Sequence, residues 1–186
     1  RHPPTLMNTA PIPPASGPGP DRSPLPTLTV LDTLPAGFLS TPAHELHRVL
    51  NGPTLIHLPG RREPRLFVSV LLHGNEDVGL VAIQNLLRDH LCKGPGHELP
   101  RAMSIFIGNV SAAQYGLRRL DDQPDYNRVW PGTVLHEGTP EHDLMTQVRR
   151  IMAARGVFAS VDIHNNTGLN PHYSVVNRLD PAVLHL

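Results

Sequence analysis

The chain has 186 residues, and its 16 lysine and arginine residues balance 16 aspartate and glutamate residues, so the formal net charge is zero. This balance argues against nucleic acid as a partner, and the apolar runs are too short for a membrane-spanning helix. A single cysteine, Cys92, excludes an internal disulfide and is compatible with a reducing compartment, which favours a cytoplasmic protein.

Proline is concentrated at the start of the chain. Eleven of the 21 prolines precede residue 43, and the segment 1–26 has few apolar side chains and no hydrophobic period. Such a composition cannot offset the entropy that is lost when a chain becomes ordered. We therefore expect residues 1–27 to form a flexible, disordered proline-rich leader and residues 28–186 to form one folded domain.

Predicted strands and helices alternate along this domain. Apolar and β-branched runs predict strands at residues 28–34, 54–58, 65–72, 103–107, 157–163 and 173–176. Helical spacing and capping residues predict helices at residues 42–50, 76–91 and 141–155. In the helix at 76–91, the residues expected to face the sheet are Val78, Val81, Ala82, Leu86 and Leu87. The alternation predicts an α/β fold in which a mixed, largely parallel sheet carries helices on both faces.

The first candidate site is the turn between the strand at 65–72 and the helix at 76–91. His73 follows the strand and Glu76 begins the helix, and Gly74 allows a tight backbone path between them. An imidazole and a carboxylate can then meet outside the carboxyl end of the strands, where open α/β sheets bind ligands. The alternative is an ordinary helix start at which Glu76 only favours the helix dipole.

A second histidine stands at the corresponding end of a later strand. His164 follows the strand at 157–163 and leads into a polar loop, so parallel strands would place it near His73. Two histidines and one carboxylate are a common ligand set of catalytic zinc sites. Asp162 lies on the same side of the strand as His164 and is a candidate to orient that imidazole. A buried acid bonded only to backbone donors is the alternative for Asp162.

The third segment, residues 118–132, is charged and rich in turn residues. Within it, Arg128 stands beside Asn127, and an arginine next to an amide suits the recognition of a substrate carboxylate. The alternative is a solvated loop held by local ion pairs.

Together, the three segments resemble the succinylglutamate desuccinylase and aspartoacylase family, a branch of the zinc carboxypeptidase superfamily. That family carries H-G-N-E after a strand, then D-L-N-R followed closely by P-G, and then D-L-H-N-T. This chain has His73-Gly74-Asn75-Glu76, Asp125-Tyr126-Asn127-Arg128 with Pro131-Gly132, and Asp162-Ile163-His164-Asn165 with Thr167. The resemblance spans residues 54–167 and implies a zinc carboxypeptidase-like fold.

The resemblance also implies an activity. His73, Glu76 and His164 would bind one zinc ion per chain. The enzyme would be a zinc-dependent hydrolase that cleaves the amide bond of small N-acylated amino acids with a metal-activated water. The alternatives are a zinc carboxypeptidase or amidase that acts on peptides or cell-wall fragments, and a non-catalytic zinc-binding remnant.

Further residue roles follow from the same resemblance. Asn127 and Arg128 would bind the carboxylate of the amino-acid part of the substrate. An arginine shortly before the D-L-N-R motif would polarise the scissile carbonyl; Arg119 is the best match, and adjacent Arg118 is the alternative. The family's general-base glutamate comes well after the last ligand, but no glutamate follows His164 in this chain. We therefore expect the chain to be the N-terminal part of a longer enzyme.

Overall fold

A computed structural model describes residues 25–92, 94, 97–166, 168–169, 171–176 and 180–181. The predicted leader lies outside these residues except for its last three. The strands are β1 (Thr29–Leu31), β2 (Thr54–Leu58), β3 (Arg65–Val70), β4 (Met103–Ile107) and β5 (Val157–Asp162). The helices are α1 (Val78–Leu91), α2 (Val110–Ala113) and α3 (Pro140–Arg155), with short 3-10 helices η1 (Ala43–Arg48) and η2 (Tyr126–Arg128).

The five strands form one mixed sheet in the order β1-β2-β4-β3-β5. Three neighbouring pairs are parallel, and only β2 runs antiparallel to its neighbour β4. The prediction of a largely parallel α/β sheet is therefore confirmed. Because β3, β4 and β5 run in the same direction, the loops after all three leave from the same end of the sheet.

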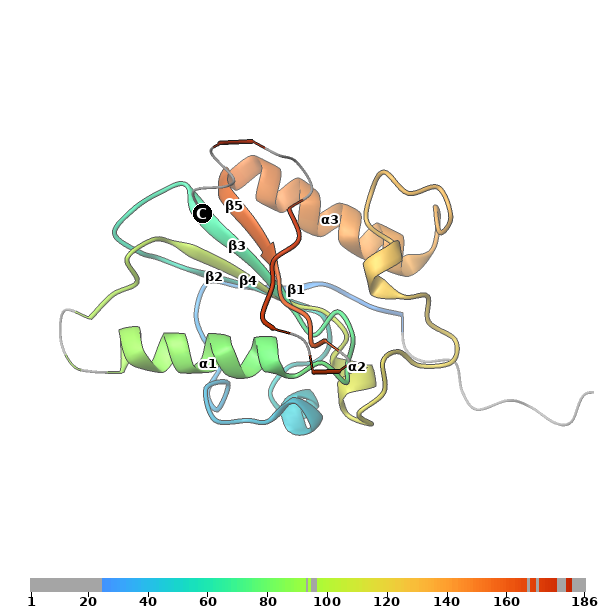
Figure 1. Ribbon diagram of the computed structural model, residues 1–186, viewed down its shortest axis with the longest axis horizontal. Helices are drawn as coiled ribbons and strands as arrows, with labels where there is room; N and C mark the ends of the chain where they lie inside the picture. The colour runs from blue at the N-terminus through green and yellow to red at the C-terminus, as the bar shows by residue number, and fades with distance from the viewer. Residues whose placement is uncertain are drawn as a thin grey trace, which may run out of the picture.

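Helices cover both faces of the sheet (Figure 1). One face packs against α1, through a core that includes Val68, Val70 and Ile105 of the strands. The other face packs against α3, through a core that includes Phe67 and Phe106. Successive residues of a strand point to opposite faces, so continuously apolar strands such as β3 and β4 supply both cores.

The buried face of α1 differs from the predicted one. Of the five residues expected to face the sheet, only Leu87 is buried, and the buried side chains are instead those of Leu80, Ile83, Gln84 and Leu87. Leucine, valine and isoleucine occur on several sides of this helix, so spacing alone did not identify the packed side. A polar residue belongs to that side, because the Gln84 amide donates to the backbone oxygens of Phe38 and Thr41.

The boundaries of α3 are confirmed. Thr139 is its N-cap, and its hydroxyl accepts a hydrogen bond from the backbone N–H of His142. Pro140 occupies the first turn, where its missing N–H is not needed, and Gly156 ends the helix with φ = 75°.

The strand expected at 173–176 is absent, and these residues are exposed and have no regular secondary structure. Alternating valine and tyrosine side chains favour a strand only where a neighbouring strand offers hydrogen bonds. Within the described part of the chain, no helix is long and apolar enough to cross a membrane.

Candidate metal centre

The end of β3 delivers His73 to the edge of the sheet through an unusual backbone turn. Leu71, directly after the strand, has φ = 52°, which is the left-handed region that a leucine rarely adopts. Its side chain is fully buried, so packing holds this conformation in place. The chain consequently changes direction, and the His73 side chain lies buried at 2 % exposure beside the carboxyl ends of the strands.

Gly74 is required at the next position by close packing. A β-carbon on Gly74 would lie 2.3 Å from the backbone nitrogen of Ala113 in α2 and 2.7 Å from the carbonyl oxygen of Leu117. The backbone N–H of Gly74 also donates to the carbonyl oxygen of Arg118 at 3.1 Å. The loop around residue 118 is thereby fixed against the His73–Glu76 turn.

The end of β5 delivers His164 to the same edge. Asp162, the last residue of the strand, accepts a hydrogen bond of 2.8 Å from the Ser69 hydroxyl on neighbouring β3. The following loop returns to α1, where the Asn165 side chain accepts a hydrogen bond from the backbone N–H of Val78. The second histidine is therefore positioned by contacts with both β3 and α1.

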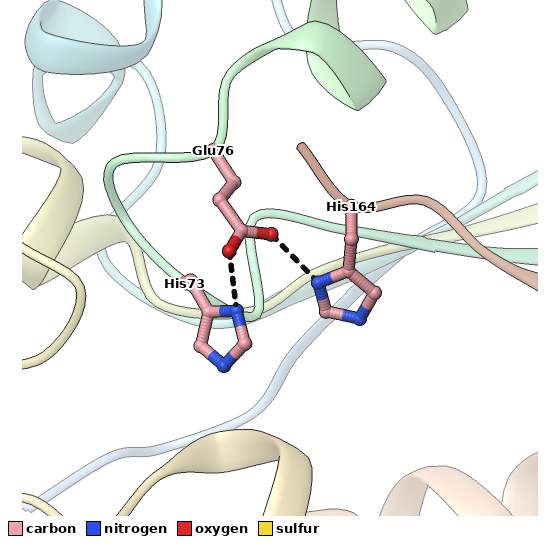
Figure 2. Close-up of side chains that lie close together, drawn as sticks. All are labelled: His73, Glu76 and His164. Atoms are coloured by element: carbon pink, nitrogen blue, oxygen red, sulfur yellow. Dashed lines mark hydrogen bonds and ion pairs between the residues drawn. The ribbon is translucent and has the colours of Figure 1, made fainter. Parts of the chain in front are cut away.

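Glu76 stands between the two histidines (Figure 2). One carboxylate oxygen lies 2.9 Å from Nδ1 of His73, and the other lies 2.7 Å from Nδ1 of His164. The two rings have their centroids 5.0 Å apart. One ligand atom from each of the three residues falls within 4.8 Å of the others, so this group could hold a metal ion.

The outer nitrogen of each imidazole faces a second carboxylate. Nε2 of His73 lies 2.9 Å from Asp125 Oδ1, and Nε2 of His164 lies 2.8 Å from Asp162 Oδ2. An acid on the far nitrogen fixes the orientation of the ring and makes the near nitrogen more basic. The contact expected between Asp162 and His164 is therefore present, and Asp125 has the equivalent position at His73.

These contacts perturb two pKa values. Hydrogen bonding to Asp162, with a smaller contribution from Glu76, raises the pKa of His164 to about 9 although burial acts to lower it. Burial acts to raise the pKa of Asp125, but hydrogen bonds from His73, the Asn127 backbone and Arg118 outweigh it and lower that pKa to about 2. The carboxylates that hold a proton on the His164 ring would also favour a metal cation at that ring.

The structure places Arg118 at this cluster and Arg119 outside it. Two guanidinium nitrogens of Arg118 donate to Asp125 Oδ2 at 3.0 and 3.3 Å, and a third donates to Glu76 at 3.3 Å. Arg119 instead donates to carbonyl oxygens of its own loop, including that of Gln123 at 2.9 Å. Of the two arginines, the structure therefore brings Arg118 and not Arg119 into contact with the cluster.

Asn127 and Arg128 lie on the 3-10 helix η2, on the side of His164. The Asn127 amide nitrogen is 3.2 Å from Nε2 of His164, and the Asn127 backbone N–H donates to Asp125. Arg128 is exposed and donates to the carbonyl oxygen of Asn127. Asn127 thus touches the cluster itself, whereas Arg128 stands at its solvent side.

Sequence reasoning from the residues missed two parts of this site. Asp125 is 52 positions from His73, and no local sequence pattern at either residue predicts the contact between their side chains. Its place as the first residue of the D-Y-N-R segment was the one available signal. Asn165 was likewise overlooked, although its backbone N–H donates to Glu76 at 3.2 Å.

Comparison of the chain with protein-family models, with curated proteins and with solved structures found no match in any of the three. The resemblance to the succinylglutamate desuccinylase and aspartoacylase family therefore stays an expectation drawn from the three sequence motifs.

Proposed function

We propose that the protein is a zinc-dependent hydrolase that cleaves the amide bond of small N-acylated amino acids. One observation carries the proposal: His73 and His164 both turn Nδ1 towards Glu76 and Nε2 towards an aspartate. Carboxylate-supported imidazoles of this kind are typical of zinc sites. The position of the group at the carboxyl end of parallel strands also agrees with ligand binding in open α/β sheets.

The residues present fit a divalent metal ion. Two imidazoles and one carboxylate are a donor set that zinc accepts, with an open position left for water or substrate. The three donor atoms are close enough to share one ion after small side-chain movements. A zinc ion bound there would supply a Lewis acid and a water of lowered pKa.

Arg118 is the candidate for stabilising negative charge on the substrate. Its side chain is about half exposed, and its guanidinium reaches both Glu76 and Asp125. A guanidinium in this place can donate to an oxyanion that develops at the carbonyl of a bound amide. We assign to Arg118 the role that the sequence predicted for Arg119.

Asn127 and Arg128 are the candidates for binding the substrate carboxylate. Asn127 contacts the outer nitrogen of His164, Nε2, and the exposed guanidinium of Arg128 is its sequence neighbour, so both residues stand beside the candidate metal site. A guanidinium paired with an amide suits a carboxylate, so the proposed substrates carry a free carboxylate on their amino-acid part.

The metal site is tested by counting bound metal. Purified protein is stripped with a chelator, reloaded with zinc, and analysed for metal content after removal of free ion. We expect about one ion per chain for the native protein and for His44→Ala, an exposed histidine, and a large loss for His164→Ala. Equal zinc content in all three proteins would remove the ligand assignment.

The substrate class is tested with the longest soluble form of the protein, loaded with zinc. A screen contains N-acetyl and N-succinyl amino acids, their amides without the free carboxylate, and short peptides. Turnover of the free acids and not of the amides supports the proposal. Activity on peptides alone would indicate a carboxypeptidase or amidase, and stoichiometric zinc binding without any turnover would indicate a non-catalytic binding protein.

A further inference from the structure

We propose that Arg118 competes with the metal ion for the Glu76 carboxylate. Arg118 neutralises Glu76 when no metal is bound, and its guanidinium releases Glu76 when a metal ion binds. The inference rests on the proposed function, since it takes the group of His73, Glu76 and His164 as the metal site. It adds a residue that sets how tightly the metal is held.

The contacts of Arg118 place its charge on the metal-ligand side of the cluster. The terminal nitrogen NH1 donates to Oε1 of Glu76, which is the same oxygen that contacts Nδ1 of His73. The guanidinium therefore contacts one oxygen of a carboxylate that belongs to the candidate metal site. A divalent cation and a guanidinium cannot both keep full contact with this oxygen, because each is positively charged and each needs the same lone pairs.

Arg118 has a second partner that lets it move without leaving the site. Its Nε and NH2 atoms both donate to Oδ2 of Asp125, while Oδ1 of that carboxylate faces His73. If NH1 releases Glu76, the side chain can still be held by Asp125. The exchange then needs only a small rotation of a half-exposed side chain.

The charges determine whether Arg118 weakens or strengthens metal binding. Loading metal on the native protein breaks one charge-assisted hydrogen bond and brings a dication close to a guanidinium. Both terms oppose binding, so removing the Arg118 charge should strengthen metal binding. If Arg118 served only to hold Asp125 in position behind His73, its removal would instead weaken metal binding.

The test compares metal affinity in Arg118→Gln and Arg119→Gln. Glutamine keeps a donor for Asp125 and removes the charge, and Arg119 is the matched control because its guanidinium contacts loop carbonyls and not the cluster. Zinc affinity is measured by competition with a chromogenic chelator, without any assay of hydrolysis. We expect Arg118→Gln to bind zinc about tenfold more tightly than the native protein, because the variant loses a partly exposed charge pair and a like-charge contact with the metal. The zinc affinity of Arg119→Gln should stay within about twofold of the native value.

Thermal unfolding supplies a second readout. In excess chelator, Arg118→Gln should unfold at a lower temperature than the native protein, because Glu76 then lacks its arginine. Its rise in unfolding temperature on adding zinc should be larger than that of the native protein. Arg118→Lys should fall between the two, because an ammonium is a single donor group that cannot bridge both carboxylates in the same way.

The outcomes are distinct. Unchanged or weaker zinc binding in Arg118→Gln, with native-like folding, would overturn the competitor role and leave the proposed function standing. Tighter binding in both glutamine variants would show a general effect of loop charge and would also overturn it. If the native protein and all variants bind no zinc, the proposed function and the inference fail together.

Discussion

The two ends of the sheet each hold a buried histidine, and the two sites differ in the charge that surrounds it. At the carboxyl end of β3, His73 lies among the carboxylates of Glu76 and Asp125. At the opposite end, His57 on β2 contacts the Ser104 hydroxyl at 2.7 Å and lies 3.5 Å from the Arg65 guanidinium. The same residue type is thus placed in acidic surroundings at one end and in basic surroundings at the other.

The difference decides what each end can bind. Burial, together with Arg155 and Arg65, lowers the pKa of His57 to about 4, so this ring is neutral at pH 7. Arg65 and Arg155 place positive charge near this ring, which disfavours the binding of a cation there. A histidine becomes a candidate metal ligand through nearby carboxylates, and burial alone does not make it one. Four changes test this contrast, taken from the largest expected effect to the smallest.

Replacing Glu76 should have the largest effect. Glu76→Gln removes the charge that both Nδ1 atoms face, so we expect zinc binding to become undetectable at concentrations that saturate the native protein. Asp77→Asn, an exposed acid one position further on, is the matched control and should keep full zinc content. Calorimetric titration measures zinc binding by both variants. Zinc binding retained by Glu76→Gln would show that the acidic end of the sheet does not owe its metal binding to this carboxylate.

Replacing the aspartates behind the imidazoles should have an intermediate effect. We expect Asp125→Asn and Asp162→Asn to weaken zinc binding by about 10- to 100-fold, because the rings lose the acid that orients them. The loss should be larger for Asp125, since its histidine is the more deeply buried of the two. Asp121→Asn, an exposed acid in the same loop as Asp125, is the control. An equal loss in the control would show an effect of overall charge.

The basic surroundings of His57 should make the free energy of unfolding depend on pH. The folded pKa of His57 is below the ordinary value of 6.5, so the folded state resists protonation while the unfolded state accepts it. This contribution to stability is complete above pH 6.5 and is lost as the pH falls towards 4, by at most roughly 3 kcal/mol.

Chemical denaturation at several pH values compares the native protein with His57→Gln, which does not titrate. We expect the stability difference between the two proteins to shift in favour of the variant as the pH falls from 7 to 4. Parallel curves over this range would show that His57 is not held neutral by its surroundings.

The smallest change is the loss of one hydroxyl. Ser104→Ala removes the hydrogen-bond partner of His57 Nδ1 and should lower the free energy of unfolding by about 1 kcal/mol. Zinc affinity should not change, because Ser104 lies at the opposite end of β4 from the metal-ligand loops. Measured against Asp125→Asn, this variant separates damage to a buried histidine from damage to the metal centre.

The general architecture could be predicted because it depends on local patterns. Continuous apolarity marked β3 and β4 as buried on both faces, and Thr139, Pro140 and Gly156 marked both ends of α3. His73, Glu76 and His164 could be expected together because parallel strands end at one edge of the sheet.

What escaped prediction depends on contacts between distant segments. The packed side of α1 is set partly by hydrogen bonds from Gln84 to carbonyls 43 and 46 residues earlier, and a hydrophobic period carries no information about such contacts. Whether Arg118 or Arg119 faces the cluster depends on how their loop packs against the His73–Glu76 turn, where Gly74 donates to the Arg118 carbonyl oxygen. The sequence alone does not determine which of two adjacent loop side chains points towards the site.

Glu76 also has a mechanical role, because its contacts join distant parts of the chain. It meets the side chain of His164, 88 positions away, and the backbone of Asn165, 89 positions away. Contacts across this span close a long loop of the chain, so the hydrogen bonds of Glu76 act against the entropy that this closure costs. Strand β5 is the most exposed strand of the sheet, and its outer edge pairs with no described residue. The contacts of Glu76, together with the hydrogen bond from Val78 to the Asn165 side chain, connect the segment after β5 to the turn that begins α1. A metal ion bound by His73, Glu76 and His164 would strengthen the same connection between β5 and the turn before α1. Removing the ion would weaken that connection.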